Sequence, residues 1–248
     1  MAEPPVLYNI NNSLADLVAR VRMSIPGAHA GLVVLLILLV AGFSLFIPNF
    51  ASLGTLQSFM YQLPLLGLLS LAMMAPLITG GLNLAIIATT NQCALLMAFI
   101  MQSLITPDSS TGTAVAVIIL ALVAGLALCL LIGLITGSLI AYTGVHPILI
   151  TLGTKSLIDG ISIYLTRGMA LSGIPDGFSR IGTTTIVGVP LIFLLLIVVA
   201  VIVSLILRRT AFGVACAMIG SNIEAARYSA IDSRRVLVGV YVMSSLIC

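Results

Sequence analysis

Charged residues are scarce in this sequence. Asp, Glu, Lys and Arg make up 7% of its 248 residues, whereas hydrophobic residues make up 60% and the mean hydropathy is +1.28. A water-soluble domain carries roughly 25% charged residues, so this composition excludes an ordinary soluble protein. The formal net charge is only +3, and the basic residues cluster at the edges of apolar segments. That placement indicates an orientation in a membrane and argues against nucleic-acid binding.

The sequence also lacks the motifs of ATP hydrolysis and of covalent catalysis. It has no GxxxxGK[ST] nucleotide-binding loop and no HExxH or GxSxG motif. The four cysteines show no paired or metal-type spacing, and we interpret them as packing residues: Cys93, Cys129, Cys216 and Cys248. The chain is therefore expected not to be an enzyme, and no catalytic residue, metal site or cofactor is predicted.

Apolar runs dominate instead. A run of about 20 residues is the length at which a helix crosses a hydrocarbon core of roughly 30 Å. The sequence predicts an all-α, polytopic membrane protein with six to seven transmembrane helices, at about residues 31–47, 55–79, 82–106, 113–142, 146–165 and 185–207, with a last run from 236. Residues 1–30 are expected to form a surface segment, and residues 31–248 a single transmembrane domain. Because the last run stops short of spanning length, we expect the sequence to be truncated at its C-terminus.

The second apolar segment contains two prolines, Pro64 and Pro76, and ends in Gly80–Gly81. A proline inside a helix removes a backbone hydrogen bond and clashes with the preceding turn, so we expect this helix to be kinked or broken. Lipid tolerates irregular backbone only where other protein groups or a water-filled cavity satisfy it. Because the Gly80–Gly81 connection is very short, a re-entrant unit built from the second and third segments is an alternative.

Polar residues gather in the first half of the third segment. At about 100° per residue, Asn83, Thr90 and Asn91 share one helical face. Beside a broken helix, such a face is typical of the wall of a substrate pathway, to which we assign these three residues. The alternative is that they hydrogen-bond neighbouring helices as structural contacts.

Two further residue pairs lie inside apolar segments. Gly133 and Gly137 form a GxxxG motif, which allows another helix to approach closely. Lys155 and Asp159 are four residues apart and so lie on one helical face. An ionisable residue at membrane depth is costly unless it is paired or wetted. An intramembrane ion pair that neutralises itself at a helix interface is one interpretation of Lys155 and Asp159, and a proton or ion relay is the other.

The longest polar interval between apolar runs is residues 208–235, which hold five of the ten basic residues. Within it, Ser221 and Glu224 have the spacing of a capping box, in which Ser221 caps the helix and Glu224 reaches back to the cap. The pattern predicts a short helix at 222–230, with small Ala225 and Ala226 and with Arg227 at its surface. One interpretation is a helix that inserts into a groove of a partner, and the other is a helix that lies flat on the membrane.

The distribution of arginine predicts the orientation. Six spans before residue 208 place the amino terminus and the 208–235 loop on one side, with Arg20, Arg22, Arg208, Arg209, Arg227, Arg234 and Arg235. The opposite side holds only Arg167 and Arg180. We therefore assign the N-terminus and the 208–235 loop to the cytoplasm and expect the 167–185 loop to face outward.

Three ordered blocks of the sequence resemble the permease subunits of bacterial ABC importers for ribose and related monosaccharides. The block TAFGVACAMIGSNIEAARYSAI resembles the cytoplasmic coupling region of that family, GLITGSLIAYTGVHPILITLGT resembles a second block, and GGLNL resembles its GGIDL. In the coupling region the matching residues are Thr210, Phe212, Gly213, Ala217, Gly220, Asn222, Ala225, Ala226, Ser229 and Ile231. The sequence departs from the pattern at Asn83, where the family has aspartate, and at Ala230, where it usually has glycine.

The resemblance implies a permease that moves a small sugar across the bacterial inner membrane. It also implies the partners: two cytoplasmic ATPase subunits, an extracytoplasmic solute-binding protein and a second permease copy or paralogue, with membrane lipid around the assembly. The residues it assigns to ATPase coupling are Gly220, Asn222, Glu224, Ala225, Ala226, Arg227 and Ser229. The alternatives are an ion-coupled secondary transporter that uses Lys155 and Asp159 and a membrane scaffold that transports nothing.

Overall fold

The computed structural model describes residues 30–106, 109–169, 176–186 and 188–248. The predicted surface segment lies almost wholly outside these residues, as do Arg20 and Arg22. The chain divides into two compact units, residues 1–58 and 59–248. The first contains helix α2 (Ala30–Phe46) and the beginning of α3 (Leu53–Ile78), and the second contains the rest of α3 and all later elements.

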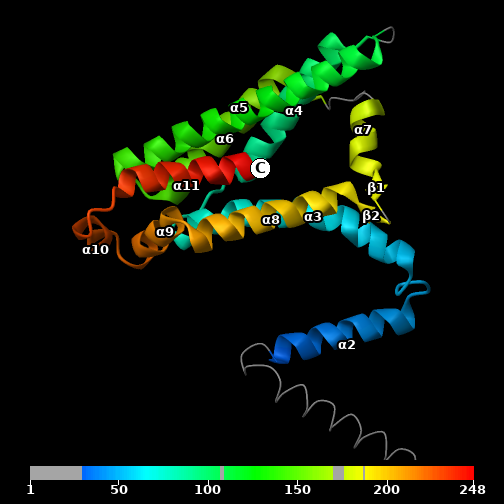
Figure 1. Ribbon diagram of the computed structural model, residues 1–248, viewed down its shortest axis with the longest axis horizontal. Coiled ribbons are helices and arrows are strands. Elements are labelled where there is room, and N and C mark those ends of the chain that lie inside the picture. Colours follow the sequence, from blue (N-terminus) through cyan, green and yellow to red (C-terminus); the bar gives the residue numbers. More distant parts are fainter. Residues whose placement is uncertain (1–29, 107–108, 170–175, 187) are drawn as a thin grey trace, which may run out of the picture. The chain divides into compact units, whose positions relative to one another are not determined.

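Helices make up nearly all of the described chain, joined by short turns (Figure 1). After α3, the elements are α4 (Ile86–Leu104), α5 (Thr111–Thr143), α6 (Pro147–Thr166), α7 (Asp176–Thr183), β1 (Thr185–Ile186), β2 (Val189–Pro190), α8 (Leu191–Arg209), α9 (Ala211–Ser221), α10 (Ile223–Tyr228) and α11 (Ser233–Ile247). Five of them, α3, α4, α5, α6 and α8, are long and apolar enough to cross a membrane. The apolar α2 has 17 residues and α11 has 15. The predicted all-α, polytopic fold is thus confirmed.

The sixth apolar span begins later than predicted. Strands β1 and β2 pair antiparallel, with Thr185 opposite Pro190 and Ile186 opposite Val189. Gly188 has a φ of 82°, a backbone angle that glycine adopts without the steric cost that a side chain brings. Pro190 then precedes the first turn of α8. The paired strands and Gly188 precede the helix, so the apolar helix α8 starts at Leu191 and not at residue 185.

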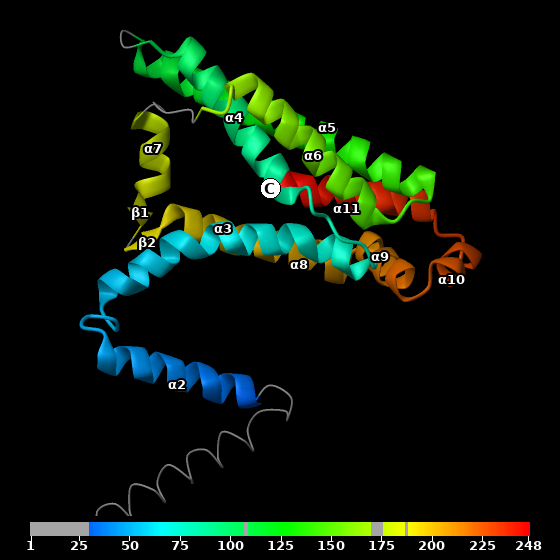
Figure 2. The ribbon, with the colours of Figure 1, turned by 180° about the vertical axis from the view of Figure 1, so that it is seen from behind.

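The second helix is continuous rather than broken. Pro64 and Pro76 both lie inside α3 and both are buried, and Figure 2 shows that the helix bends along its length. The interruption comes after the helix, where Gly80 has a φ of 80° and the Gly81 amide donates to the Pro76 carbonyl at 2.9 Å. Helix α4 begins only at Ile86. The irregular backbone that the sequence predicted thus lies between the two helices.

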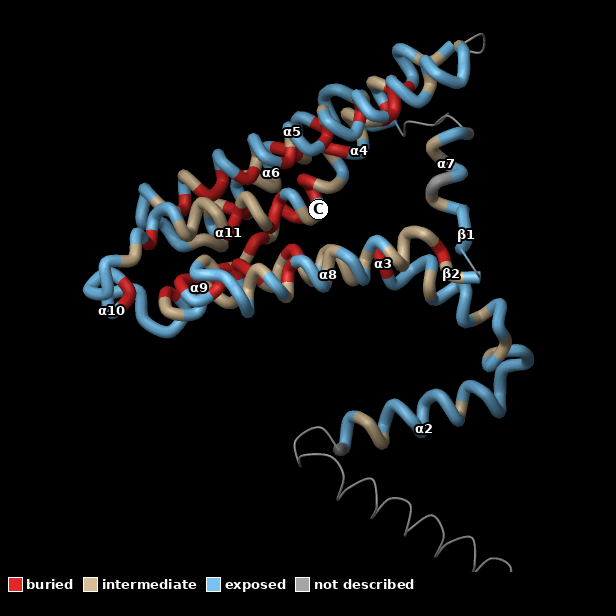
Figure 3. Tube along the Cα trace, viewed as in Figure 1, coloured by how far each residue is buried: buried red, intermediate tan, exposed pale blue. Residues whose placement is uncertain are grey.

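The best-buried part of the second unit lies where α5 meets α11. A Cβ atom added at Gly133 would lie 2.8 Å from the Cα of Val242, and one added at Gly137 would lie 3.0 Å from the Cα of Val238. The close approach predicted from the GxxxG motif is confirmed, and the helix that approaches is α11. Figure 3 shows buried residues concentrated along these facing helices, while most of α2 and much of α8 are exposed, as expected for lipid-facing segments.

A small apolar core ties the amino-terminal half of this unit to the 208–235 loop. Its fully or nearly fully buried members come from α3, α5, α9 and α11: Ala75, Ile140, Cys216, Val240 and Tyr241. Burial raises the pKa of the Cys216 thiol to about 11, so the thiol stays protonated at neutral pH. Cys216 is a packing residue, as predicted.

Candidate functional site

The 208–235 loop is more ordered than its sequence suggested. Helix α9 occupies its first third, where no helix was predicted. Thr210 caps α9 by accepting from the Gly213 amide, and the Thr210 hydroxyl itself donates to the Ile206 carbonyl at 2.6 Å. Small residues in α9 made its apolar face hard to recognise from sequence. Its buried side packs on α3, α5 and α11 through Cys216.

The short helix predicted after α9 is present, but its cap is different. The Asn222 Oδ1 accepts from the amides of Glu224 and Ala225 at 3.0 and 3.1 Å. Ser221, the predicted cap, is instead the last residue of α9, and its hydroxyl donates to the Met218 carbonyl. Asn222 is extended, with a φ of −162°, which is the backbone conformation that an N-cap requires. The predicted cap is therefore wrong: it lies one residue later, at Asn222.

Helix α10 is also shorter than predicted. It covers Ile223–Tyr228 instead of 222–230, and Ala230 has a left-handed φ of 59°. Glu224 pairs with Arg227 at 2.9 Å instead of reaching back to the cap. A left-handed residue ends a helix, so Ala230 adopts the conformation for which glycine is better suited at this position.

The predicted coupling residues divide into an outer and an inner set. Ala226 is fully buried, with 0% exposure, and it faces the body of the protein. The others are exposed: Gly220, Asn222, Glu224, Ala225, Arg227 and Ser229. Tyr228 beside them is 91% exposed. Apart from Gly220, which belongs to α9 and meets the end of α3, the outer set is the surface of α10 and its caps that is open to another molecule, at the end of this unit opposite to α7 (Figure 1).

The three predicted pathway residues do not share a helical face. Asn83 precedes α4 and is buried, with its Nδ2 donating to the Ser244 Oγ at 2.9 Å and its Oδ1 accepting from the Ala85 amide at 3.1 Å. The Thr90 hydroxyl donates to the Ile86 carbonyl, whereas Asn91 is exposed. The helical-wheel argument fails because the helix starts at Ile86 and not near residue 82. A role for these residues in a substrate pathway stays a prediction.

Two polar contacts that the sequence did not reveal hold α4 in place. The Ser162 hydroxyl of α6 donates to the Gln92 Oε1, and the sulfur atoms of Cys93 and Cys129 lie 3.0 Å apart between α4 and α5. Each pair joins residues 36 to 70 positions apart, so no local spacing could show it. Gln92 of α4 thus makes a side-chain hydrogen bond with α6.

Lys155 and Asp159 form the ion pair that their spacing predicts. The Lys155 Nζ lies 2.9 Å from the Asp159 Oδ2, and the two side chains are 40% and 39% exposed. Each charge therefore has its partner on the same helix. This geometry matches the interpretation of a self-neutralising pair.

This pairing leads to a prediction about single and double substitutions. We expect Asp159→Leu alone to destabilise the protein more than the Lys155→Leu/Asp159→Leu double variant, because the single change leaves an unpaired ammonium in an apolar span. Thermal unfolding of the purified variants in detergent measures the order. A relay of ions would instead give two variants that are equally stable and equally inactive.

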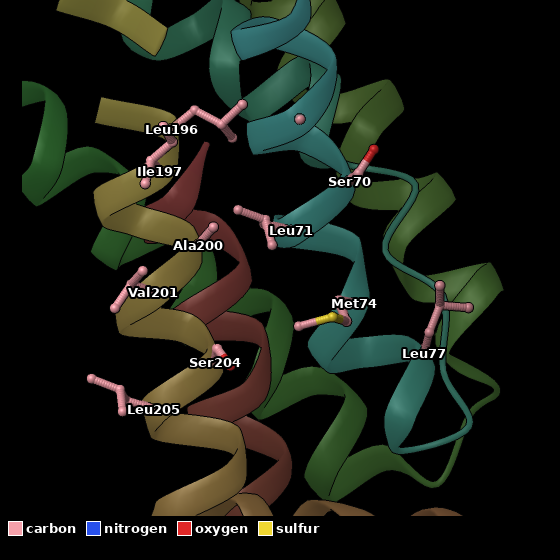
Figure 4. Close-up of a pocket in the computed structure, with 11 residues that line it drawn as sticks. Ser70, Leu71, Met74, Leu77, Leu196, Ile197, Ala200, Val201, Ser204 and Leu205 are labelled. Atoms are coloured by element: carbon pink, nitrogen blue, oxygen red, sulfur yellow. The ribbon is translucent and has the colours of Figure 1, made fainter. Parts of the chain in front are cut away.

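An apolar groove lies between α3 and α8. Its volume is about 770 Å³, and Figure 4 shows Leu71 and Met74 of α3 facing Ala200 and Ser204 of α8 across it. Ser70 and Ser204 supply its only hydroxyls, and the Ser70 hydroxyl already donates to the Leu66 carbonyl at 2.7 Å. A sugar requires several convergent polar groups, so this groove does not match a monosaccharide site.

Comparison with known proteins places these features in a transport context. A family model described as "Branched-chain amino acid transport system / permease component" matches residues 55–248. The chain is 30% identical over 220 residues to the "Autoinducer 2 import system permease protein LsrD" of Salmonella typhimurium, which covers 86% of this chain and 63% of the relative. The protein of the same name from Yersinia enterocolitica is 30% identical over 188 residues, 73% of this chain and 53% of the relative.

The chain thus spans between about half and two thirds of the length of these relatives. No solved structure matches it. The matched range of the family model includes α3 to α11 and with them the 208–235 loop.

Proposed function

Because the chain belongs to the family of branched-chain amino acid transport system permease components, we propose that it is a membrane-spanning subunit of an ATP-binding-cassette importer. In this proposal it moves a monosaccharide or a similar small polar solute across the bacterial inner membrane by alternating access. A separate subunit hydrolyses the ATP. The observation that carries the proposal is α10, a short capped helix whose exposed side projects between α9 and α11.

The solute class is inferred from similarity. The relatives' name gives autoinducer 2 as what their system imports, and the family description gives branched-chain amino acids. Three sequence blocks resemble the monosaccharide importers, which favours a sugar or a sugar-like solute. A second permease subunit and an extracytoplasmic solute-binding protein complete the proposed assembly, with the described part of the 167–185 loop on the outer side.

The orientation follows from where the basic residues lie. Arg208 and Arg209 end α8, and Arg234 and Arg235 begin α11, beside α9 and α10. Arg234 also lies over the Tyr142 ring, with its guanidinium carbon 5.3 Å from the ring centroid. An excess of arginine marks the cytoplasmic side of a membrane protein. We propose that this end, and with it α10 and the N-terminus, faces the cytoplasm, where ATPase subunits reside.

The exposed surface of α10 has the properties of a helix that docks on a partner protein. Ala225 is small and exposed, so a partner can approach the helix backbone closely, and the Glu224–Arg227 pair leaves no net charge beside it. A six-residue helix buries little area by itself. Firm docking therefore depends on shape complementarity and on neighbouring contacts.

The test compares two adjacent alanines of α10. We expect Ala225→Leu to abolish co-purification with the ATPase subunit of the proposed importer and to reduce uptake at least about tenfold, because the added side chain blocks the docking surface. Membrane insertion and thermal stability should stay unchanged, since Ala225 is exposed.

The matched control is Ala127→Leu, which places the same side chain on an exposed site of α5 far along the chain from the loop. It should leave both ATPase binding and uptake intact. Ala226→Leu should behave differently again, because Ala226 is fully buried and its enlargement disturbs α10 itself. The proposal is wrong if Ala225→Leu retains wild-type ATPase binding and uptake.

A further inference from the structure

The connector between α3 and α4, residues 79–85, touches three other helices. The Leu82 carbonyl accepts from the Thr151 hydroxyl of α6 at 3.2 Å. A Cβ at Gly81 would lie 2.5 Å from the phenolic oxygen of Tyr241 in α11 and 3.4 Å from the Pro147 ring in α6. Gly81, Asn83 and Ala85 are all buried. The buried residues of this irregular backbone are therefore packed against α6 and α11.

Asn83 fastens the end of the connector that leads into α4. Its amide nitrogen donates to Ser244 of α11, and its amide oxygen accepts from the Ala85 amide, one residue before α4 begins. The next turn follows directly, because the Thr89 amide and hydroxyl both bond to the Ala85 carbonyl. The Asn83 amide group thus links α11 to the residue before α4, and it is buried, with 2% exposure.

Gly220 meets the other end of the connector. A Cβ at Gly220 would overlap the carbonyl oxygen of Ile78, the last residue of α3, and would lie 3.3 Å from the Thr79 Cα. Only a glycine allows the backbones of α9 and α3 to meet this closely. Gly220 is also two residues before Asn222, the cap of α10. The first residue of the connector therefore lies beside the backbone of α9, two residues before the cap of the proposed docking helix.

We propose that residues 79–85 relay movements of α9 and α10 to the first turn of α4, with Gly220 and Asn83 as positioning residues at the two ends of the relay. The inference deepens the proposed function and rests on it for its role in transport. A closely packed contact transmits displacement because it has no free space to absorb it. Asn83 then acts on the transport cycle by placing α4, and not by binding the solute.

The relay predicts an effect in both directions, because coupling between two sites is reciprocal. The test is hydrogen–deuterium exchange of the full chain in lipid nanodiscs. Gly220→Ala should speed exchange at residues 85–90 by about tenfold, since the first turn of α4 loses its support. Ser244→Ala, which removes only the hydroxyl that holds Asn83, should speed exchange at residues 223–228 of α10.

Ser245→Ala is the matched control for the second arm. Ser245 is also buried in α11, but it packs against Gly133 of α5 instead of the connector. A route through α11 alone predicts equal changes in α10 for Ser244→Ala and Ser245→Ala, and that result would overturn the proposal. So would unchanged exchange in α10 for Ser244→Ala. Because Ser244→Ala removes only a hydroxyl group, it tests the proposal even if Gly220→Ala does not fold.

The exchange experiment uses neither an ATPase nor a solute. Its outcome is therefore independent of the Ala225→Leu test. Loss of the relay with intact ATPase docking would reject the relay alone, and a working relay without ATPase docking would reject the importer assignment alone.

Discussion

Gly137→Leu is expected to separate α11 from α5 and to destabilise the protein by on the order of 3 kcal/mol. Even a single added carbon at this position would lie 3.0 Å from both the Cα and the carbonyl oxygen of Val238, and 3.2 Å from the Tyr241 Cβ. Because two of these atoms belong to the backbone, the helix as a whole must move away. Tyr241 and Val240, which are fully buried in the core of this unit, would become exposed.

Thermal unfolding in detergent measures this loss, and Gly153→Leu provides the control. Gly153 also lies within an apolar helix, but a Cβ there meets no atom within 4 Å. We expect Gly153→Leu to keep the wild-type unfolding temperature. Equal destabilisation of the two variants would mean that the loss comes from replacing a helical glycine and not from the α5–α11 contact.

Gly213→Ala is the second change with a large expected effect. A Cβ at Gly213 would overlap the Leu207 carbonyl group at the end of α8, so the turn between α8 and α9 must open. Helix α9 would then be displaced, and Cys216, which has 0% exposure in the native protein, would come into contact with solvent. The destabilisation is again on the order of 3 kcal/mol, because the clash is with backbone atoms that cannot rotate away.

The displacement can be measured by alkylating Cys216 with a maleimide. The extent of alkylation is read from the mass of the peptide that contains Cys216. In the native protein the reaction should be slow at pH 7, because burial blocks access and raises the pKa of the thiol to about 11, so little thiolate forms. Exposure in Gly213→Ala lowers the pKa toward its ordinary value and should speed alkylation at least about tenfold. Gly160→Ala, at a glycine with open space around it, should leave the rate unchanged.

These glycines show how the chain uses small residues for different purposes. Gly133 and Gly137 bring two long helices together, Gly213 allows a tight turn between α8 and α9, and Gly220 lets α9 touch the end of α3. The sequence indicated the first pair through the GxxxG spacing. It placed Gly213 and Gly220 only through the family resemblance, because the turn that brings Gly213 against Leu207 and the packing that brings Gly220 against Ile78 of another helix have no local sequence pattern.

Composition and periodicity alone determined that this is an all-α membrane protein. Long apolar runs have no other solution in lipid than helices, since every backbone N–H and C=O group must be satisfied within the segment. The Lys155–Asp159 pair could also be predicted, because its geometry depends only on the helical repeat. In the same way, the short helix in the 208–235 loop could be expected from its sequence, and its existence is confirmed.

Details that depend on the exact ends of helices could not be read from the sequence. The cap of α10 is Asn222 and not the predicted Ser221, because α9 continues through Ser221. No helix had been predicted in the segment that forms α9. The prediction that Asn83, Thr90 and Asn91 share a helical face is wrong, because α4 starts three residues after Asn83. The rotation of about 100° per residue applies only inside a helix, so a residue that falls outside the helix end cannot be placed on its faces.

The sequence by itself determined the class of protein, the rough place of its long apolar helices and the polar loop that interrupts them. Only the tertiary structure decided which residues meet: Asn83 with Ser244, Cys93 with Cys129, and Gly220 with Ile78. The physical reason is that backbone hydrogen bonding and the hydrophobic effect act on local runs of residues, whereas these contacts join positions far apart in the chain. Their geometry exists only after the helices have packed.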